Sequence, residues 1–356
     1  MQKLNMMCAI NFTGYGITSF NIYKRLREKL DICLFPIGSP QVDTDEYASR
    51  LAEDISKQSS YNNEDTCFKI WHQFDLASRI GNKKYGGLTF FEVDKLKDVE
   101  VRMINNMDVI FVASHWAKNV LESNGVTTKI VVSPLGIDPV LFNDNINSQV
   151  NKDQNKYVFL NIGKWEVRKG HDVLVEIFNE AFKDDDNVEL WMLNHNPFLS
   201  QEENNMWIGL YKNSKLGSKI KVFPRINAHA DVAKLIALSD CGIFPARAEG
   251  WNNEVPEFFA LNKPVILTNY SAHTEYANKD NSYLIDINEL STANDGKFFN
   301  GFGNWANIGD KQIEQTIEHM RYVYKNNIRT NPIGLETAKT LTWSNTADII
   351  YNHLYG

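Results

Sequence analysis

Two segments of the sequence combine charged residues and glycines in patterns that suit an anionic ligand. In the first, residues 160–178, a strand-like run ends at Gly163 and an amphipathic helix starts after Gly170. Three cations lie between these glycines: Lys164, Arg168 and Lys169. Because the amino end of a helix carries partial positive charge and N–H donors, cations there favour a bound diphosphate. A solvated basic loop is the alternative for this segment taken alone.

The second segment follows the apolar run 241–245 and holds two glutamates, Glu249 and Glu257, with seven residues between them. Glu249 is predicted in a loop and Glu257 inside the next helix, so the two carboxylates can reach different groups of one extended ligand. Backbone amides in the intervening loop offer hydrogen-bond donors to the same ligand: Gly250, Trp251, Asn252 and Asn253. The alternative for isolated glutamates is charge complementarity at a helix start.

A third segment places Gly14 and Gly16 between the first predicted strand and the first predicted helix. Glycines at such a junction let the backbone approach a ligand closely. The dinucleotide fingerprint G-x-G-x-x-G is incomplete, because Ser19 occupies the position of its third glycine. The segment is therefore either a tight turn or a contact to a phosphate or sugar, and an oxidoreductase is disfavoured.

The elements that must position these segments alternate along the chain. Short apolar runs rich in β-branched and aromatic residues alternate with longer segments of helical period, which is typical of parallel sheets. Strands are predicted at residues 4–11, 31–37, 67–74, 88–92, 109–113, 129–133, 157–163, 188–193, 220–223, 241–245, 264–267 and 282–285. Helices are predicted at residues 18–30, 45–57, 95–106, 114–123, 172–182, 202–211, 232–239, 254–260, 311–324 and 343–354.

This alternation predicts an α/β fold with two doubly wound domains. Residues 143–155 are polar and have neither periodicity, so they are the candidate linker. We expect an amino-terminal domain over residues 1–148, a carboxy-terminal domain over residues 149–342, and a last helical segment over residues 343–356 whose packing partner stays open. Ligands of such sheets bind outside the carboxyl ends of the strands, so the two domains are expected to face a common cleft.

Composition narrows the function classes. The chain has 356 residues, 43% hydrophobic and 23% charged, with a net charge of −7, which suits a folded globular protein and disfavours a nucleic-acid-binding surface. No apolar run approaches the roughly 20 residues that cross a bilayer. The first residues predict a strand and no secretory signal. The four cysteines lie far apart and predict buried thiols in a reducing cytoplasm: Cys8, Cys33, Cys67 and Cys241.

The two charged segments together resemble motifs of the family 4 retaining glycosyltransferases, which belong to the group 1 glycosyl transferases. Residues 163–170 resemble the family's diphosphate-binding loop, and residues 249–266 resemble its two-glutamate motif. Residues 87–96, 105–126 and 131–142 also resemble segments of that family. The resemblance covers nearly the whole chain. It implies the GT-B architecture, in which two Rossmann-like domains face an inter-domain cleft.

The resemblance also implies roles for individual residues. Lys169 and Lys164 would bind the diphosphate of a nucleotide-sugar and stabilise its charge during reaction, with Lys164 standing where the family often has arginine. Glu257 would bind the ribose hydroxyls. Glu249 would hold the donor sugar near the reacting carbon and so affect catalysis. The neighbouring backbone amides would also hold the donor sugar, namely those of Gly250, Trp251, Asn252 and Asn253.

Further contacts are expected around the same ligand. Gly14 and Gly16 are implied to close over the phosphates, and nucleobase choice is expected in the loop that contains Arg225 and Ile226. Many family members place a histidine near the reacting sugar, in a segment resembling residues 87–96, but this sequence has none there. The alternatives in the first half are three polar side chains that could approach the cleft: His72, Glu92 and Asp94.

No metal site is expected. Asp43 and Asp45 open a predicted helix and suggest capping, while residues 184–186 form a polar turn after a helix. Neither acidic group follows an apolar strand, as the metal-binding D-x-D of the other major glycosyltransferase architecture would. The histidines lack metal-ligand spacing, and His171, next to the cation loop, is ambiguous.

The resemblance therefore implies a retaining, metal-independent glycosyltransferase, hexosyltransferase-like, that needs no cofactor beyond a UDP-, GDP- or ADP-sugar donor. In the resembled family, the incoming hydroxyl attacks the face from which the diphosphate leaves, and the diphosphate helps to deprotonate it. The acceptor is expected to be a glycan, a lipid-linked molecule or a protein, in the cytoplasm, with peripheral membrane contact left open. Two rivals are a nucleotide-sugar epimerase on a related fold and a non-catalytic nucleotide-sugar-binding protein.

Overall fold

The computed structural model describes residues 1–356 and divides the chain into two compact units. The first unit comprises Met1–Gly136 together with Leu341–Gly356, and the second comprises Ile137–Thr340. The boundary expected after residue 148 therefore falls inside the second unit. The last helical segment, for which the sequence left the packing partner open, lies in the first unit.

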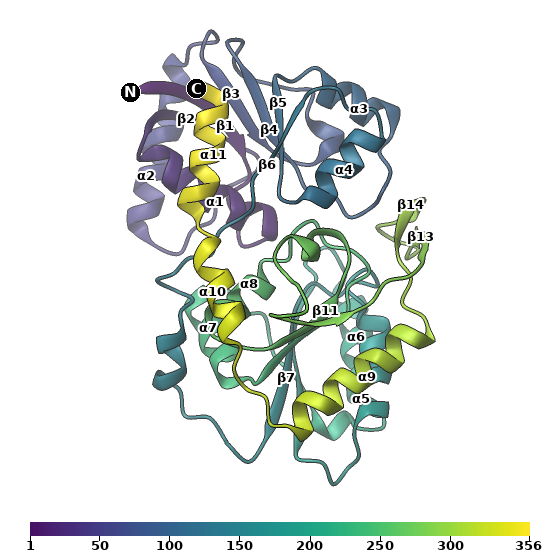
Figure 1. Ribbon diagram of the computed structural model, residues 1–356. Coiled ribbons are helices and arrows are strands. Elements are labelled where there is room, and N and C mark those ends of the chain that lie inside the picture. The colour runs from purple at the N-terminus through teal and green to yellow at the C-terminus, as the bar shows by residue number, and fades with distance from the viewer. The chain divides into compact units, whose positions relative to one another are not determined.

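The first unit contains one parallel six-stranded sheet, in the order β2-β1-β3-β4-β5-β6 (Figure 1). Its strands are β1 (Gln2–Cys8), β2 (Leu30–Pro36), β3 (Thr66–Ile70), β4 (Tyr85–Leu88), β5 (Val109–Val112) and β6 (Lys129–Val132). Strands β3, β4 and β5 are buried along their whole length, as central strands of a sheet covered on both faces must be.

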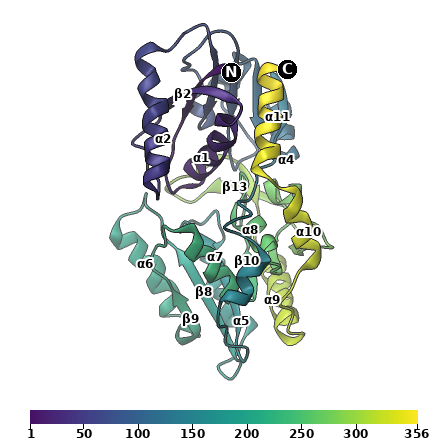
Figure 2. The ribbon, with the colours of Figure 1, turned by 90° about the vertical axis from the view of Figure 1, so that its left-hand side faces the viewer.

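Helices connect and cover these strands. They are α1 (Gly14–Arg27), α2 (Asp45–Ser56), α3 (Asp98–Asn105), α4 (His115–Ser123) and the returning α11 (Trp343–Tyr355), with short 3₁₀ turns at Lys57–Ser60 and Gln73–Asp75. Helix α11, near the C-terminus, runs beside α1 and also contacts β5 (Figure 2). Gly136 has room for no side chain, because a Cβ there would lie 2.0 Å from the backbone nitrogen of Trp343. This contact holds the start of α11 against the first unit.

The second unit contains a parallel six-stranded sheet in the order β12-β11-β10-β7-β8-β9. Its strands are β7 (Tyr157–Gly163), β8 (Val188–Asn194), β9 (Ile220–Val222), β10 (Cys241–Phe244), β11 (Val265–Thr268) and β12 (Tyr283–Ile285). Reversed, this order is the 3-2-1-4-5-6 arrangement of a Rossmann sheet. Strand order changes direction between β7 and β10, which is where ligands of such sheets bind.

The helices of the second unit lie on both faces of its sheet (Figure 1). They are α5 (His171–Ala181), α6 (Gln201–Lys212), α7 (His229–Leu238), α8 (Glu254–Ala260), α9 (Asp310–Lys325) and α10 (Pro332–Thr340), with 3₁₀ turns at Asp144–Gln149, Gly217–Lys219 and Ser271–Glu275. Helix α9 packs against α5, and side chains of both helices form one core with β7, β8 and β10. This core fixes the amino end of α5 relative to the carboxyl ends of β7 and β10.

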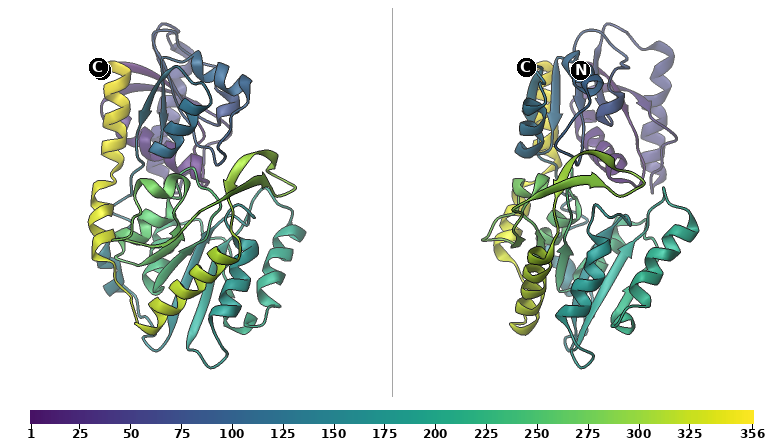
Figure 3. Two further views of the ribbon diagram at one scale, coloured as in Figure 1. Left: turned by 45° about the vertical axis from the view of Figure 1, so that its right-hand side comes forward. Right: turned by 90° about the vertical axis from the view of Figure 1, so that its right-hand side faces the viewer.

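Several features differ from the sequence-based assignment. Strands β1 and β3 end earlier than predicted, at Cys8 and Ile70 instead of residues 11 and 74. The strand predicted at residues 88–92 is β4, which covers Tyr85–Leu88 and includes Gly86 and Gly87. A Cβ on Gly86 would lie 2.6 Å from a Leu354 methyl group, and one on Gly87 would lie 2.3 Å from the Met107 methyl group. Glycines are depleted in strands, so they hid this one. Helix α10 was not predicted. The antiparallel hairpin of β13 (Leu290–Asn294) and β14 (Asn300–Ala306) was also missed; it projects from the second unit as a separate ribbon (Figure 3).

Other local predictions are confirmed. Thr44 caps α2, and its side chain accepts a hydrogen bond from the backbone of Tyr47 at 3.3 Å, so the Asp43–Asp45 region opens a helix as expected. All four cysteines are buried free thiols. No helix in the structure is both long enough and apolar enough to span a membrane.

Candidate active site

The two charged segments of the sequence follow the two strands at which the second sheet reverses its order. Residues 164–170 connect β7 to α5, and residues 245–253 connect β10 to α8. Because β7 and β10 are parallel neighbours, the two loops leave the same edge of the sheet. A backbone hydrogen bond joins them directly, from the nitrogen of Arg247 to the oxygen of Arg168 at 2.6 Å.

Gly170 makes the close approach of the two loops possible. Its φ of +74° lies in the left-handed region, which residues with a side chain rarely adopt. A Cβ at this position would also lie 2.0 Å from the carbonyl oxygen of Pro245, in the other loop. The glycine predicted to precede a helix start is therefore needed for the contact between the two loops as well as for the turn.

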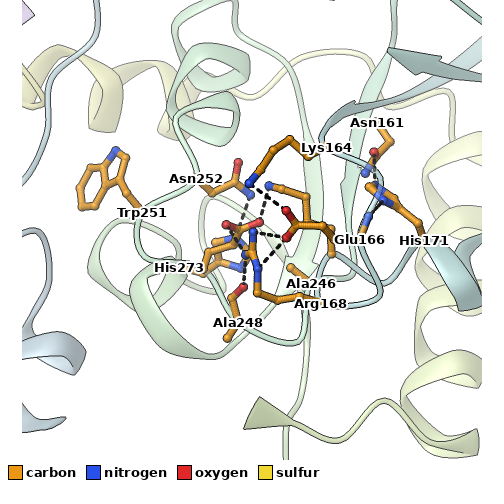
Figure 4. Close-up of polar contacts among 12 residues, drawn as sticks. Asn161, Lys164, Glu166, Arg168, His171, Ala246, Ala248, Trp251, Asn252 and His273 are labelled. Atoms are coloured by element: carbon orange, nitrogen blue, oxygen red, sulfur yellow. Dashed lines mark hydrogen bonds and ion pairs between the residues drawn. The ribbon is translucent and has the colours of Figure 1, made fainter. Parts of the chain in front are cut away.

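Five charged side chains form one continuous chain of ion pairs across the two loops (Figure 4). The Glu166 carboxylate forms ion pairs with Nζ of Lys164 at 2.8 Å and with Nη2 of Arg168 at 2.7 Å. The Glu249 carboxylate forms ion pairs with Nη1 of Arg168 at 2.9 Å and with Nζ of Lys169 at 2.6 Å. Positive and negative groups alternate, with a lysine at each end. Three cations and two carboxylates leave one positive charge in excess.

The sequence analysis named the arginine at the centre of this chain only as one of three cations in the loop. Only 3% of Arg168 is exposed. Its Nη1 also donates to the backbone oxygen of Ala248 at 2.6 Å, and its Nε donates to Glu166 at 3.0 Å. Arg168 therefore connects the loop after β7 to the loop after β10. Glu249 lies far away in sequence, so only the folded sheet reveals the pairing.

Charge and burial together set the protonation of the two carboxylates. Burial alone would raise the pKa of Glu166 and of Glu249, because a low-dielectric site disfavours charge. The neighbouring cations outweigh burial: Arg168 and Lys164 lower the pKa of Glu166 to about 2, and Arg168 and Lys169 hold the pKa of Glu249 well below its usual range. Both carboxylates stay ionised at neutral pH. Glu249 is thus unsuited to act as a general acid.

Glu254 and Glu257, on α8, lie in the opposite electrostatic situation. Burial raises the pKa of Glu254, and the opposing effect of Lys169 does not cancel it. Burial raises the pKa of Glu257 well above its usual range, and the charge of Glu254 adds to the shift. No ion pair compensates Glu257 in the structure. A bound group that donates hydrogen bonds to its carboxylate would favour ionisation.

Replacing Glu257 by glutamine is expected to stabilise the ligand-free protein at neutral pH. A carboxyl whose folded pKa exceeds its unfolded value lowers stability as pH rises above the unfolded pKa, about 4.3 for glutamate. The neutral amide removes that loss. Urea unfolding at pH 7.5 should show a higher midpoint for Glu257→Gln than for wild type. At pH 4 the difference should vanish. Glu176→Gln, on the exposed side of α5, serves as control; equal midpoints at pH 7.5 would contradict the expectation.

The loop between the two glutamates contains three consecutive residues with unsatisfied polar atoms. Nε1 of Trp251, Oδ1 of Asn252 and Oδ1 of Asn253 are buried and have no hydrogen-bond partner. Buried polar groups are nearly always bonded, so such a run calls for an explanation, for which a polar ligand is one. The Trp251 side chain points away from the ion pairs (Figure 4) and packs against Tyr276, with ring centroids 4.9 Å apart.

The remaining predicted contacts of the second unit lie along the same sheet edge. Arg225 and Ile226 lie in the connection from β9 to α7, which starts at the carboxyl end of β9. Arg225 is exposed and Ile226 is partly exposed. Two strands, β7 and β8, lie between β9 and β10 in the sheet, so the structure does not bring these residues into the ion-pair chain.

In the first unit, the structure brings the three predicted segments together around Tyr15. Its hydroxyl accepts a hydrogen bond from the Phe90 nitrogen at 2.9 Å and donates one to the Phe90 oxygen at 3.1 Å. Its ring lies 4.4 Å from that of His72. Gly14 and Gly16 start α1 on either side of Tyr15, and a Cβ on Gly16 would lie 2.3 Å from the Asn11 backbone. Glu92 and Asp94 follow Phe90.

The acidic triplet at residues 184–186 lies in the turn between α5 and β8, where the Asp186 carboxylate accepts a hydrogen bond from the Lys183 nitrogen at 2.7 Å. The triplet therefore lies in a polar turn after a helix, as predicted. No group of three or more His, Cys, Asp or Glu side chains in the structure has an arrangement that could hold a metal ion.

Residues 142–295 match the family model described as Glycosyl transferases group 1. The match covers 154 of the 356 residues, all of them in the second unit, so the similarity to the group 1 family concerns that unit. The matched residues contain both loops and the complete ion-pair chain, so the family assignment and the site geometry concern the same part of the molecule. The resemblance to group 1 seen in the sequence is confirmed.

A curated relative is an uncharacterized glycosyltransferase from Methanocaldococcus jannaschii, 27% identical over 168 residues. The match covers 45% of this chain and 39% of the relative, so it spans less than half of either protein. Part of the chain is thus similar to a glycosyltransferase in this comparison also, and the similarity does not extend to the whole chain.

Several solved structures share the complete fold. Sucrose-phosphate synthase from Thermosynechococcus elongatus has a TM-score of 0.74 at 14% identity, with 100% of this chain and 99% of that one covered. The Anabaena protein HepE, in complex with UDP and glucose, has a TM-score of 0.71 at 14% identity, with 99% of both chains covered. At these identities the similarity shows the fold alone. The fold is GT-B, with two Rossmann-like α/β domains, as predicted.

Proposed function

We propose that this protein is a retaining glycosyltransferase that moves a hexosyl group from a nucleotide-sugar to an acceptor hydroxyl. The observation that carries the proposal is the ion-pair chain at the strand-order reversal of the second sheet, within the residues that match the group 1 family. It presents two lysines at its ends and one excess positive charge beside the amino end of α5. That combination suits a diphosphate, which is the leaving group of a nucleotide-sugar.

The two terminal lysines are proposed to bind that diphosphate. Lys164 and Lys169 each have one carboxylate partner in the ion-pair chain, whereas Arg168 is bonded to two carboxylates and a carbonyl oxygen. A lysine ammonium has three donors, so each lysine can add a phosphate oxygen to its present partner. Arg168 is proposed to keep Glu166 and Glu249 in place while the lysines act on the ligand.

The glutamates of α8 and its preceding loop are proposed to bind the rest of the donor. Glu257 would accept hydrogen bonds from the ribose hydroxyls, which fits a carboxylate without an ion-pair partner. Glu249 would hold the sugar, together with the Gly250 to Asn253 loop and its unsatisfied polar atoms. Nucleobase choice would fall to Arg225 and Ile226, on the same sheet edge.

The proposed reaction is a substitution at the anomeric carbon on one face of the sugar. The bond from that carbon to the diphosphate oxygen breaks, and the bond to the acceptor oxygen forms. The acceptor hydroxyl loses its proton to the departing diphosphate. The enzyme's contribution is to stabilise charge that accumulates on the diphosphate, and the residues proposed for this role are Lys164 and Lys169. No step needs a metal ion in this scheme.

The first unit is proposed to bind the acceptor, which would be a glycan, a lipid-linked molecule or a protein. Gly14 and Gly16 would face the donor phosphates, and His72, Glu92 and Asp94 would line the acceptor side. Tyr15 supports this grouping, because it connects all three segments through its hydroxyl and its ring.

A thermal-shift screen against UDP-, GDP- and ADP-sugars tests the proposal. A ligand that binds the folded state raises the melting temperature by mass action. One nucleotide class should stabilise the wild type and fail to stabilise Lys169→Ala and Glu257→Ala. Lys221→Ala, a change to an exposed lysine on β9, should respond like wild type. UDP-glucose is the first probe, because solved complexes of the GT-B neighbour HepE contain it.

Product analysis then separates transfer from its rivals. Incubation with the selected donor should give a glycosylated product only when an acceptor is added. Conversion of the donor to an epimer without acceptor would indicate an epimerase. Saturable binding without transfer to any acceptor would indicate a binding protein, and no response to any nucleotide-sugar would refute the proposal as a whole.

A further inference from the structure

Two histidines with no exposed surface lie directly behind the two loops of the candidate site. His171 is the first residue of α5, next to the cation loop. His273 lies in the 3₁₀ turn after β11, next to the loop that follows β10. In each histidine, both ring nitrogens form hydrogen bonds. The partners of the two nitrogens determine which of them carries the proton of the neutral ring.

The partners of His171 require a proton on Nε2. Its Nδ1 lies 3.1 Å from the backbone nitrogen of Glu166, which can only donate, so Nδ1 carries no proton. Its Nε2 lies 2.9 Å from Oδ1 of Asn161, whose amide nitrogen donates to the Ile243 oxygen at 2.6 Å. Nε2 also lies 3.1 Å from Nδ2 of Asn194, which donates to the same Asn161 oxygen at 2.8 Å. The Nε2 proton therefore points at an acceptor. Burial, reinforced by Lys169, lowers the pKa of His171 to about 3, so the ring is neutral.

The partners of His273 require the opposite arrangement. Its Nδ1 lies 3.0 Å from the backbone oxygen of Thr268, which can only accept, so Nδ1 carries the proton. Its Nε2 lies 3.0 Å from Nδ2 of Asn252 and accepts a hydrogen bond from it. Burial lowers the pKa of His273 to about 4, and the Glu249 charge does not reverse that direction. This ring is also neutral at physiological pH.

From these contacts we infer that His171 and His273 are positioning residues of opposite tautomer, each of which holds one loop of the donor site. His171 would hold Glu166 and so the cations that bind diphosphate. His273 would hold Asn252 and so the loop that binds the donor sugar. The inference rests on the proposed function for the identity of the ligands, and on the contacts of the two rings for the tautomers.

His171 acts on the diphosphate through Glu166. The Glu166 nitrogen is tied to Nδ1, and the Glu166 carboxylate holds both Lys164 and Arg168. Loss of the Nδ1 acceptor would leave a buried N–H unsatisfied and release the residue that aligns these two cations. The expected result is weaker binding of any ligand that carries a diphosphate, with no effect on a nucleoside.

His273 acts on the sugar through the orientation of one amide. Because Nε2 accepts from the Asn252 nitrogen, the Asn252 oxygen must point away from His273, as Figure 4 shows. That oxygen has no partner and is closed to solvent, and the backbone of Asn252 has a φ of +73°. A left-handed residue with an unsatisfied buried acceptor is a strained arrangement typical of ligand-binding loops. A donor-sugar hydroxyl that enters the loop would supply the missing hydrogen-bond donor.

The opposite tautomers allow a crossed test. The amide of asparagine lies where the Nδ1 side of histidine lies, and the amide of glutamine reaches the Nε2 side. His171→Asn can therefore still accept from the Glu166 nitrogen, whereas His171→Gln cannot. At the other site the order is reversed: His273→Gln can still accept from Asn252, whereas His273→Asn cannot. A purely structural role of burial and volume would not produce this reversal.

Calorimetric binding of inorganic pyrophosphate, UDP, uridine and UDP-glucose measures the effects. At residue 171, asparagine should retain the wild-type affinity for pyrophosphate and UDP, and glutamine should lose about tenfold, the size of one lost buried hydrogen bond. Uridine affinity should not change. At residue 273, UDP affinity should not change, and the advantage of UDP-glucose over UDP should fall about tenfold with asparagine and persist with glutamine. Equal losses for both substitutions at a site, or the opposite order, would overturn the inference for that site.

Nitrogen-15 NMR of the wild-type rings provides a readout that needs no ligand and no variant. His171 should appear as a neutral ring with the proton on Nε2, and His273 as a neutral ring with the proton on Nδ1. A reversed tautomer or a charged ring at pH 7 would overturn the inference. If the wild type binds no UDP-, GDP- or ADP-sugar while both tautomers are as stated, the proposed function fails and the positioning of the two loops stands.

Discussion

Replacing Lys169 by alanine should lower turnover with the selected donor by about 10²–10³, the usual effect of removing one preorganised charge from a transition state. Lys169 is 8% exposed and ends the ion-pair chain, with Nζ 2.6 Å from Glu249. Burial alone would lower the pKa of Lys169, but Glu249 and Glu254 outweigh burial and raise it, so the ammonium stays charged. A charged donor in a site of low dielectric is worth far more than one in water.

Steady-state kinetics with saturating acceptor measures this effect. Because the diphosphate gains charge as it leaves, the loss should appear in kcat as well as in kcat/KM. Lys221→Ala removes a lysine of the same domain that pairs with Glu189 on the neighbouring strand, and should leave both constants unchanged. Full activity of Lys169→Ala with a proven donor would refute the assignment of Lys169 to the leaving group.

Replacing Arg168 by methionine should lower the free energy of unfolding by about 3–5 kcal/mol, the usual effect of removing one partner from a buried ion pair. Methionine fills similar space without charge. The Glu166 and Glu249 carboxylates would each lose a cation, and the Ala248 oxygen would lose its hydrogen-bond donor. Chemical denaturation at pH 7.5 measures the change. Arg25→Met, on an exposed helix position paired with Glu28, should have little effect.

The loss of unfolding free energy in Arg168→Met should depend on pH through the carboxylates of Glu166 and Glu249. Their folded pKa values lie below the unfolded value of about 4.3, so they contribute stability above that pH and lose it as pH falls. The gap between wild type and Arg168→Met should therefore narrow as pH falls from about 4.3 toward 2. Adding Glu166→Gln to Arg168→Met should recover part of the stability, because one uncompensated charge is removed. A gap that stays constant over this range would show that packing, and not charge, explains the loss.

The sequence predicted most of the elements because their signals are local. Strand β7 and helix α8 have the predicted bounds. The ends of the other strands of the second sheet lie within one residue of the predicted ends. A central parallel strand is apolar along its whole length, and an amphipathic helix repeats its apolar face, so neither depends on distant residues. Where glycines replaced that pattern, as in β4, or where the chain formed an exposed hairpin, as in β13 and β14, the local signal was absent.

The sequence by itself also identified the two segments that form the candidate site. Cations after one strand and two spaced glutamates after another are local patterns, and they predicted both loops of the site before their positions were known. Which charges meet was a different matter. Arg168 lies within two residues of Glu166, but Glu249 reaches it only because β7 and β10 are neighbours in the sheet.

Only the tertiary structure decided the protonation and orientation of the site. The low pKa of Glu249, the raised pKa of Glu257 and the tautomers of His171 and His273 all depend on burial and on partners from other strands. Residue type and spacing determine which groups are present in a loop. Desolvation and distances between loops determine their charge, and these exist only once the sheet has formed.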